Sequence, residues 1–351
     1  MMMLRLLLGS GGSGKTTAIY QAAAEKSRSG TGDCILLVPE QYSFETERRM
    51  LQLLGPKDGQ RVTVVSFRRL VDWVYRRCGK PAGTVLSDGG RSVLMSLALE
   101  EVGDTLTYYQ GYKDTEELIG MLLSFEKELK QCGVSGEDFF TLHTLAGEAT
   151  LKQKMEENGR ILSAFEALVA QSYLDPLDDL TRILPRIQEE RLFAGSAVFV
   201  DGFKDFTTQE LAVLRLAMTQ GEELTIALCA ETLHDEEDGE GLFSPVCKTT
   251  SALMRMAREN GVTVASPVLL PPGKRYHVPE LAFLEQQLFR PHPEVFSEDC
   301  DHVLCYAGKS RHDEATFVAQ EIRRLVMEEG YRYGDFAVIA RNLQNYQGIL
   351  Q

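Results

Sequence analysis

The chain has 351 residues, of which 44% are hydrophobic and 25% are charged, values typical of a globular protein large enough for two domains. Its formal net charge of −14 excludes a surface that attracts nucleic acid or anionic membrane indiscriminately, so any DNA contact requires a local basic patch. The seven cysteines are scattered without a CxxC pair, which indicates reduced thiols in a cytoplasmic protein rather than a disulfide framework or a zinc site. No apolar run approaches the roughly 18 residues that a transmembrane helix requires.

The first predicted element is a short apolar strand, residues 4–8, that leads into a glycine-rich loop and a helix. Gly9, Gly14, Lys15 and Thr16 fit GxxxxGKT, the phosphate-binding loop of nucleotide-hydrolysing proteins. Glycines let successive backbone N–H groups point at a phosphate beside the positive end of a helix. Lys15 would reach the β- and γ-phosphates, and the Thr16 hydroxyl would bind Mg²⁺. We therefore predict an ATP site, rather than a flexible turn, at Gly9, Ser10, Gly11, Gly12, Ser13, Gly14, Lys15, Thr16 and Thr17.

Strands and helices alternate over much of the chain, which predicts an α/β fold with a parallel sheet. Further strands are expected at residues 34–38, 61–65, 197–200 and 224–228, with helices at 43–54, 67–78 and 207–220. Residues 84–190 instead read as a helical insertion between sheet strands, with helices at 91–101, 115–131, 136–144, 147–171 and 177–189. Pro185 should kink or end the last of these helices.

The last part of the chain predicts a connector and the start of a second domain. Residues 233–299 contain two expected helices and a proline-rich stretch that ends near a domain boundary. Strands at 303–307 and 336–340 flank a helix at 313–328. Two strands and one helix do not bury a core by themselves, so we expect the chain to end inside a second α/β domain of a longer protein.

Asp201 follows the apolar strand 197–200 and is the candidate for the acidic residue that holds Mg²⁺ through water beside a phosphate loop. The alternative is a plain Asp-Gly turn at the end of a strand. The residue after Asp201 is Gly202, which offers no side chain for chemistry.

Four stretches in this order and spacing resemble the N-terminal half of the AddB family, the B subunit of the bacterial ATP-dependent helicase/nuclease, a superfamily 1 helicase-like protein. They are residues 6–16, 36–41, 64–70 and 200–207, and residues 313–342 resemble the start of a second motor domain. The resemblance implies a RecA-like P-loop NTPase fold, split into motor domain 1A at 1–83 and 191–232, a 1B-like insertion at 84–190, a connector at 233–299 and an incomplete domain 2A at 300–351.

The resemblance also implies a role in processing DNA double-strand breaks for recombinational repair, with ATP and Mg²⁺ as cofactors and Asp201 as the Mg²⁺ ligand. The expected partners are single-stranded DNA and the A subunit of the helicase/nuclease, with which the full-length protein forms a heterodimer; no membrane is expected. The candidate DNA contacts are Gln41, Ser66, Phe67 and Arg68. Ser66 and Arg68 suit phosphate and Phe67 suits base stacking, but burial of Phe67 and a solvated face for Arg68 remain equally open.

Several features depart from the superfamily pattern. Gly202 stands where an active motor has a glutamate that activates water, and losing such a base removes about 10²–10⁴ in rate. Residues 224–230 lack the Gly-Asp-x-x-Gln motif, no adenine-reading glutamine precedes the first strand, and Arg341 is only a candidate arginine finger. The family's nuclease motif and iron–sulfur cysteines would lie beyond Gln351, so neither nuclease activity nor a cluster is expected in this chain.

Three functions follow from these observations. The preferred one is a degenerate motor that binds Mg-ATP, hydrolyses it poorly or not at all, and contacts single-stranded DNA. The second is an active, DNA-stimulated ATPase in which Asp205 or Glu210 supplies the base. The third is a P-loop small-molecule kinase, which the large helical insertion disfavours because such kinases are usually compact single domains.

Overall fold

The computed structural model describes residues 2–30, 32–145, 147–234, 241–273, 275–290 and 292–350. They form two compact units, Met1–Arg275 and Tyr276–Gln351. No helix within these described ranges is long and apolar enough to cross a membrane.

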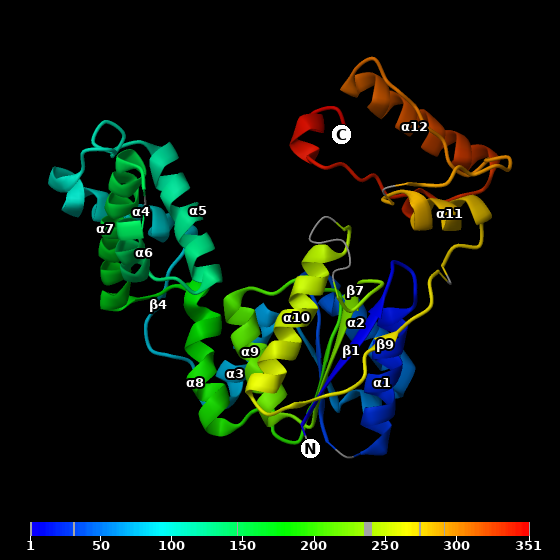
Figure 1. Cartoon of the computed structure of the whole chain (residues 1–351), viewed down its shortest axis with the longest axis horizontal. Helices are drawn as coiled ribbons and strands as arrows, with labels where there is room; N and C mark the ends of the chain where they lie inside the picture. Colours follow the sequence, from blue (N-terminus) through cyan, green and yellow to red (C-terminus); the bar gives the residue numbers. More distant parts are fainter. Residues whose placement is uncertain are drawn as a thin grey trace. The chain divides into compact units, whose positions relative to one another are not determined.

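Unit 1 is built on a seven-stranded sheet whose main order is β3-β2-β6-β7-β1-β8, with β9 also paired to β1. Figure 1 labels β1, β7 and β9 of this sheet. All of its strand pairs are parallel. The strand that carries the phosphate loop, β1, is separated by β7 from β6, the strand that leads to Asp201. The predicted α/β, RecA-like fold with a parallel sheet is therefore confirmed, and its strands are β1 (Met3–Gly9), β2 (Cys34–Leu37), β3 (Val62–Val65), β6 (Ala197–Val200), β7 (Glu223–Cys229), β8 (Thr263–Val264) and β9 (Val268–Leu269).

Helices cover both faces of the sheet, because successive strand residues point to opposite faces and both sets are apolar. Leu7, Leu36 and Phe199 belong to one buried cluster, with α1 (Lys15–Ser29) and α2 (Glu40–Gly59). The neighbouring residues Leu8, Leu37 and Val200 belong to the other, which also contains side chains of the helices α3 (Phe67–Cys78), α8 (Asp179–Glu190), α9 (Thr208–Gln220) and α10 (Ser244–Glu259).

The helical insertion has its own buried cluster, formed by side chains that include Met95, Leu122 and Phe165. Its helices are α4 (Asp88–Val102), α5 (Glu116–Cys132), α6 (Gly136–Leu142) and α7 (Ala149–Ser172), all close to the predicted ranges. Two short parallel strands, β4 (Thr84–Val85) and β5 (Tyr173–Leu174), pair the segment just before α4 with the segment just after α7. The next helix, α8, returns to the sheet, where Ile183 and Ile187 are buried, and it continues through Pro185 to Glu190.

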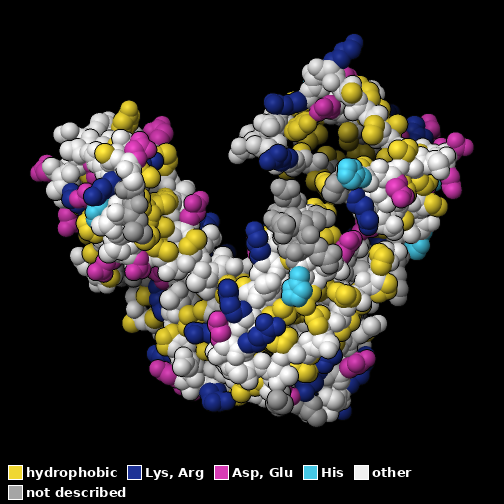
Figure 2. Space-filling view, viewed as in Figure 1, with side chains coloured by type: hydrophobic (Ala, Val, Ile, Leu, Met, Phe, Trp, Pro, Cys, Tyr) yellow, Lys and Arg dark blue, Asp and Glu magenta, His cyan; other side chains and the backbone are white. Residues whose placement is uncertain are grey.

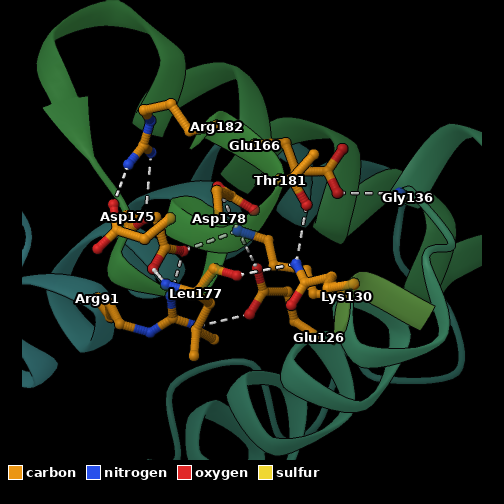
Figure 3. A network of polar contacts seen from close by, with 12 residues as sticks. Arg91, Glu126, Lys130, Gly136, Glu166, Asp175, Leu177, Asp178, Thr181 and Arg182 are labelled. Carbon is orange, nitrogen blue, oxygen red and sulfur yellow. Dashed lines mark hydrogen bonds and ion pairs between the residues drawn. The ribbon is translucent and has the colours of Figure 1, made fainter. Parts of the chain in front are cut away.

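A network of buried charges lies where the insertion meets the segment that leads into α8 (Figure 3). Arg91 on α4 pairs with Glu126 on α5 and with Asp175, which is fully buried. Lys130 lies 2.9 Å from Glu126 and 2.8 Å from both Asp175 and Asp178. Two cations and two carboxylates are thus paired out of contact with water, the partly exposed Asp178 adds a third carboxylate, and the network joins α4 and α5 to the chain before α8.

Unit 2 contains the helices α11 (Pro279–Gln287) and α12 (Arg311–Glu328), both of which were predicted. The predicted strands at 303–307 and 336–340 are wrong: both segments are irregular, and Leu304 and Ile339 are 68% and 91% exposed. A strand needs a hydrogen-bonded neighbour, and the described residues of unit 2 form no strand that could supply one. The apolar pattern therefore does not produce a sheet in this unit.

Candidate nucleotide and nucleic-acid site

The phosphate loop connects β1 directly to α1, as GxxxxGKT requires. Gly12 and Gly14 have positive φ angles of 78° and 93°, a backbone conformation that residues with a Cβ rarely adopt. Gly14 is the residue that precedes the first turn of α1, and Lys15 begins the helix. The N-terminus of α1 therefore faces the loop, where its free N–H groups favour an anion.

Polar side chains line the loop that precedes α1. The Lys15 ammonium donates to the backbone carbonyls of Gly9, at 2.8 Å, and Ser10, at 2.7 Å, so it lies across the loop. The Ser10 and Ser13 hydroxyls are buried without a hydrogen-bond partner among the described residues. Buried polar groups are normally paired, and unpaired donors beside a helix N-terminus fit a bound phosphate. Thr16 and Thr17 lie exposed in the first turn of α1.

Asp201 reaches the phosphate loop from β6. Asp201 is 6% exposed, and the Thr16 side chain lies close enough to its carboxylate to interact with it. Burial raises the pKa of Asp201, while the neighbouring Thr16 side chain, the Gly202 backbone and the charge of Lys15 act in the opposite direction. A hydroxyl and a carboxylate side by side are the hard oxygen ligands that Mg²⁺ takes from protein when phosphates and water complete its shell. The donor set therefore fits Mg²⁺.

The segment after β9 also lies against the loop, which sequence reasoning missed. The Leu270 N–H donates to the Leu8 carbonyl at 2.8 Å. The Arg275 side chain packs so closely over Gly12 that an added Cβ there would lie 2.8 Å from the Arg275 Cβ. No motif marks this contact, because Gly12 and Arg275 are far apart in the sequence. Arg275 brings a further cation to the candidate site.

This packing predicts that Gly12→Ala destabilises unit 1 by about 1–3 kcal/mol, because the new Cβ combines backbone strain with a clash. Gly11→Ala is the matched control: its added Cβ meets nothing within 4 Å and no positive φ is involved, so a change within about 0.5 kcal/mol is expected. Urea unfolding of both variants measures the difference. Equal effects of the two substitutions would contradict the observed contact.

The candidate DNA residues lie at the carboxyl ends of β2 and β3, on the same edge of the sheet as the phosphate loop. Gln41 and Arg68 are exposed and can contact a ligand. The Ser66 hydroxyl accepts from the Arg69 N–H at 3.1 Å, which caps α3, and it donates to the Glu40 carboxylate. Phe67 is 6% exposed and packs edge-on against Phe203 and Phe206. The geometry therefore favours burial over base stacking for Phe67.

The remaining predicted residues are the two alternative bases, Asp205 and Glu210, and the candidate arginine finger, Arg341. The Glu210 carboxylate accepts from the Thr207 N–H at 2.8 Å and completes a capping box at the start of α9. Burial raises its pKa, and its hydrogen bonds to Thr207 partly offset this. Asp205 is exposed in the loop before α9, and Arg341 is exposed in an irregular segment of unit 2.

Comparison with known proteins identifies the family to which the chain belongs. A family model described as "ADDB, N-terminal" matches residues 6–285. A protein of Clostridium perfringens strain SM101, named as the B subunit of an ATP-dependent helicase/deoxyribonuclease, is 29% identical over 354 residues, covering 99% of this chain and 30% of the relative. Proteins of the same name from Thermoanaerobacter sp. strain X514 and Symbiobacterium thermophilum are 29% and 32% identical, with 31% of each relative covered. The chain thus spans about a third of the length of these relatives.

Proposed function

The chain belongs to the AddB family, and from this premise we propose that it is the ATP-binding, helicase-like part of a protein that processes DNA double-strand breaks for recombinational repair. In this proposal it binds Mg-ATP at the phosphate loop, hydrolyses it poorly or not at all, and contacts single-stranded DNA. Its relatives are named as one subunit of a larger enzyme, which supports assembly with a partner, proposed to be the A subunit of the helicase/nuclease.

One observation carries the proposal of nucleotide binding: Thr16 and Asp201, which lie on different elements, come together beside a glycine loop. The loop N–H groups and Lys15 would hold the phosphates, while Thr16 and Asp201 would hold Mg²⁺. The metal ion, when bound, neutralises charge on the β- and γ-phosphates. The unpaired Ser10 and Ser13 hydroxyls supply further donors to the same site.

The proposal of slow hydrolysis rests on the residues around Asp201. Gly202 provides no carboxylate, and the Glu210 carboxylate is occupied by the cap of α9. Of the two predicted alternative bases, Asp205 and Glu210, only Asp205 does not take part in the capping box of α9. An active, DNA-stimulated ATPase is therefore the second candidate function, and ATP turnover in the presence of DNA distinguishes the two.

We expect that Gly202→Glu, which restores the residue of an active motor, does not create turnover. Gly202 has a φ of 85°, and a Cβ at this position would lie 3.0 Å from the Pro39 Cδ. The new side chain would therefore strain the turn that holds Asp201. Phosphate release by wild type and variant, with and without single-stranded DNA, is the measurement. A gain of about 100-fold, the size expected of a positioned base, would show that this turn accepts a catalytic glutamate.

DNA contact is proposed at the carboxyl edge of the sheet, through Gln41 and Arg68. Basic and acidic side chains are interspersed over the visible face (Figure 2), in keeping with the net charge of −14. We therefore expect weak, strongly salt-dependent binding of single-stranded DNA by the isolated chain.

Arg68→Ala tests this contact. We expect it to weaken binding of a labelled oligothymidylate about 3- to 10-fold and to make its dependence on salt shallower, because one phosphate contact is lost. Arg76→Ala is the matched control, since Arg76 is exposed on the same helix but at its far end. Equal losses in both variants would mean that Arg68 contributes only general charge.

A further inference from the structure

We propose that the aromatic cluster Phe67–Phe203–Phe206 couples the nucleotide site to the DNA-contacting ends of α2 and α3, so that each ligand changes the affinity for the other. Phe203 and Phe206 are positioning residues in this inference, and they touch neither ligand. The inference rests on the proposed function and adds a physical connection between its two sites.

The first step of the connection is the turn after β6. Asp201 begins this turn, and the capping box of Thr207 and Glu210 ends it at the start of α9. Within it, the rings of Phe203 and Phe206 lie 5.4 Å apart. The turn is thus anchored at both ends and filled by its own side chains. Because the Asp201 carboxylate lies beside the Thr16 side chain, a ligand that changes the partners of either group acts on this turn.

The second step leads from the turn to α3. The Phe67 ring lies 5.5 Å from the Phe203 ring and 6.4 Å from the Phe206 ring, and both contacts are edge-on. Phe67 is the first residue of α3, between the capping residue Ser66 and the exposed Arg68. Close-packed side chains transmit displacement because they leave no void to absorb it. A shift of the turn therefore moves the N-terminus of α3.

A parallel contact leads from the turn to α2. Gly202 lies against Pro39, close enough that an added Cβ would be 3.0 Å from the Pro39 Cδ. Pro39 immediately precedes α2, whose second residue is the exposed Gln41. The Glu40 carboxylate accepts a hydrogen bond from the Ser66 hydroxyl and so joins the two helix starts. Both candidate DNA elements therefore rest on the same turn.

Coupling of this kind is reciprocal. If bound nucleotide changes the affinity for DNA by a certain factor, bound DNA changes the affinity for nucleotide by the same factor. We expect this factor to be about fivefold or more in the wild-type chain, the lower end of typical couplings. Phe206→Leu should bring it close to one, because the smaller side chain loses the ring contact with Phe67. Binding of either ligand alone should change less than about twofold, since Phe206 touches neither.

The experiment measures the dissociation constant of a labelled oligothymidylate with and without a saturating Mg-bound, non-hydrolysable ATP analogue, and then the reverse titration. Phe203→Leu provides a second variant in case Phe206→Leu folds poorly, which thermal unfolding checks. Phe125→Leu is the matched control, because Phe125 makes a similar edge-on contact, at 5.0 Å with Phe139, inside the helical insertion. It should keep the wild-type factor.

The outcomes separate the two proposals. If the wild-type chain binds both ligands without mutual effect, or if Phe206→Leu and Phe203→Leu keep the wild-type factor, the coupling is overturned while the proposed function stands. If the variants weaken DNA binding equally with and without nucleotide, the cluster serves only the DNA site and the coupling is likewise overturned. If the wild-type chain binds no nucleotide, the proposed function and the coupling fail together.

Discussion

Replacing Lys15 with alanine is expected to lower the affinity of the chain for Mg-ATP by about 100-fold. The ammonium group already lies across the loop, 2.8 Å from the Gly9 carbonyl and 2.7 Å from that of Ser10, where it would meet the β- and γ-phosphates. Hydrogen bonds to charged groups contribute about 1.5–3 kcal/mol each, and about 1.4 kcal/mol corresponds to a factor of ten in affinity. Equilibrium titration with a fluorescent ATP analogue measures the loss.

Lys26→Ala is the control for this experiment. Lys26 lies near the other end of α1, where its ammonium pairs with Glu222 at 2.7 Å on the surface. Its removal subtracts the same charge from the same helix, far from the loop, and should leave the dissociation constant within about twofold, because surface charges act weakly at a distance. If both variants lose affinity equally, nucleotide binding does not depend on the loop.

The largest effect on stability is expected for Asp175→Asn, which should lower the free energy of unfolding by about 3–5 kcal/mol. Asp175 is fully buried, pairs with Arg91 and Lys130, and accepts the Leu177 N–H at 3.0 Å. Asparagine keeps the shape and the acceptor for Leu177 but removes the charge. Two buried cations are then left with Glu126 and the partly exposed Asp178 as counter-charges.

Glu156→Gln is the matched control, because Glu156 pairs with Arg160 within one helix and both side chains are about one-third exposed. Such a pair contributes about 0.3–0.5 kcal/mol. The loss in free energy of unfolding, measured by denaturant unfolding, should therefore be several-fold larger for Asp175→Asn than for Glu156→Gln. A loss below about 1 kcal/mol for Asp175→Asn would show that the network does not hold the insertion.

The same network predicts a dependence on pH. Burial alone would raise the pKa of Asp175, but its hydrogen bonds with Lys130 and Leu177 and the charges of Lys130 and Arg91 outweigh burial and hold that pKa below its ordinary value. A carboxyl with a lowered folded-state pKa stabilises the fold fully above its unfolded pKa, about 3.9, and loses this contribution as the pH falls through the folded value. The difference between wild type and Asp175→Asn should thus be constant above about pH 5 and shrink below about pH 4.

Local patterns were enough to predict the parallel sheet and the strand–loop–helix unit that carries GxxxxGKT. Both depend on features that are complete within a few residues: apolar runs of strand length, and the spacing of Gly9, Gly14 and Lys15. The place of Asp201 could be anticipated for a related reason, since carboxyl ends of parallel strands share one edge of the sheet. The insertion was also visible, because its helices have amphipathic patterns of their own.

What could not be predicted depends on distant partners. Nothing near Arg91 indicates that it pairs with Asp175, 84 residues away, or that Arg275 packs on Gly12. Phe67 follows the cap of α3 whether it stacks on a base or is buried. Its burial depends on the positions of Phe203 and Phe206, which the local sequence does not indicate. The segments 303–307 and 336–340 have the composition of strands, but a strand forms only where a neighbour satisfies its backbone.

We propose above all that the chain binds Mg-ATP without turning it over efficiently. The most direct test of this proposal is steady-state phosphate release at saturating Mg-ATP, with and without single-stranded oligothymidylate, on the same samples used to measure equilibrium binding. We predict binding that requires Lys15, together with turnover at or near the Lys15→Ala background under both conditions. Turnover well above that background, stimulated by DNA and abolished by Lys15→Ala, would contradict it and assign the missing base to a carboxylate such as Asp205.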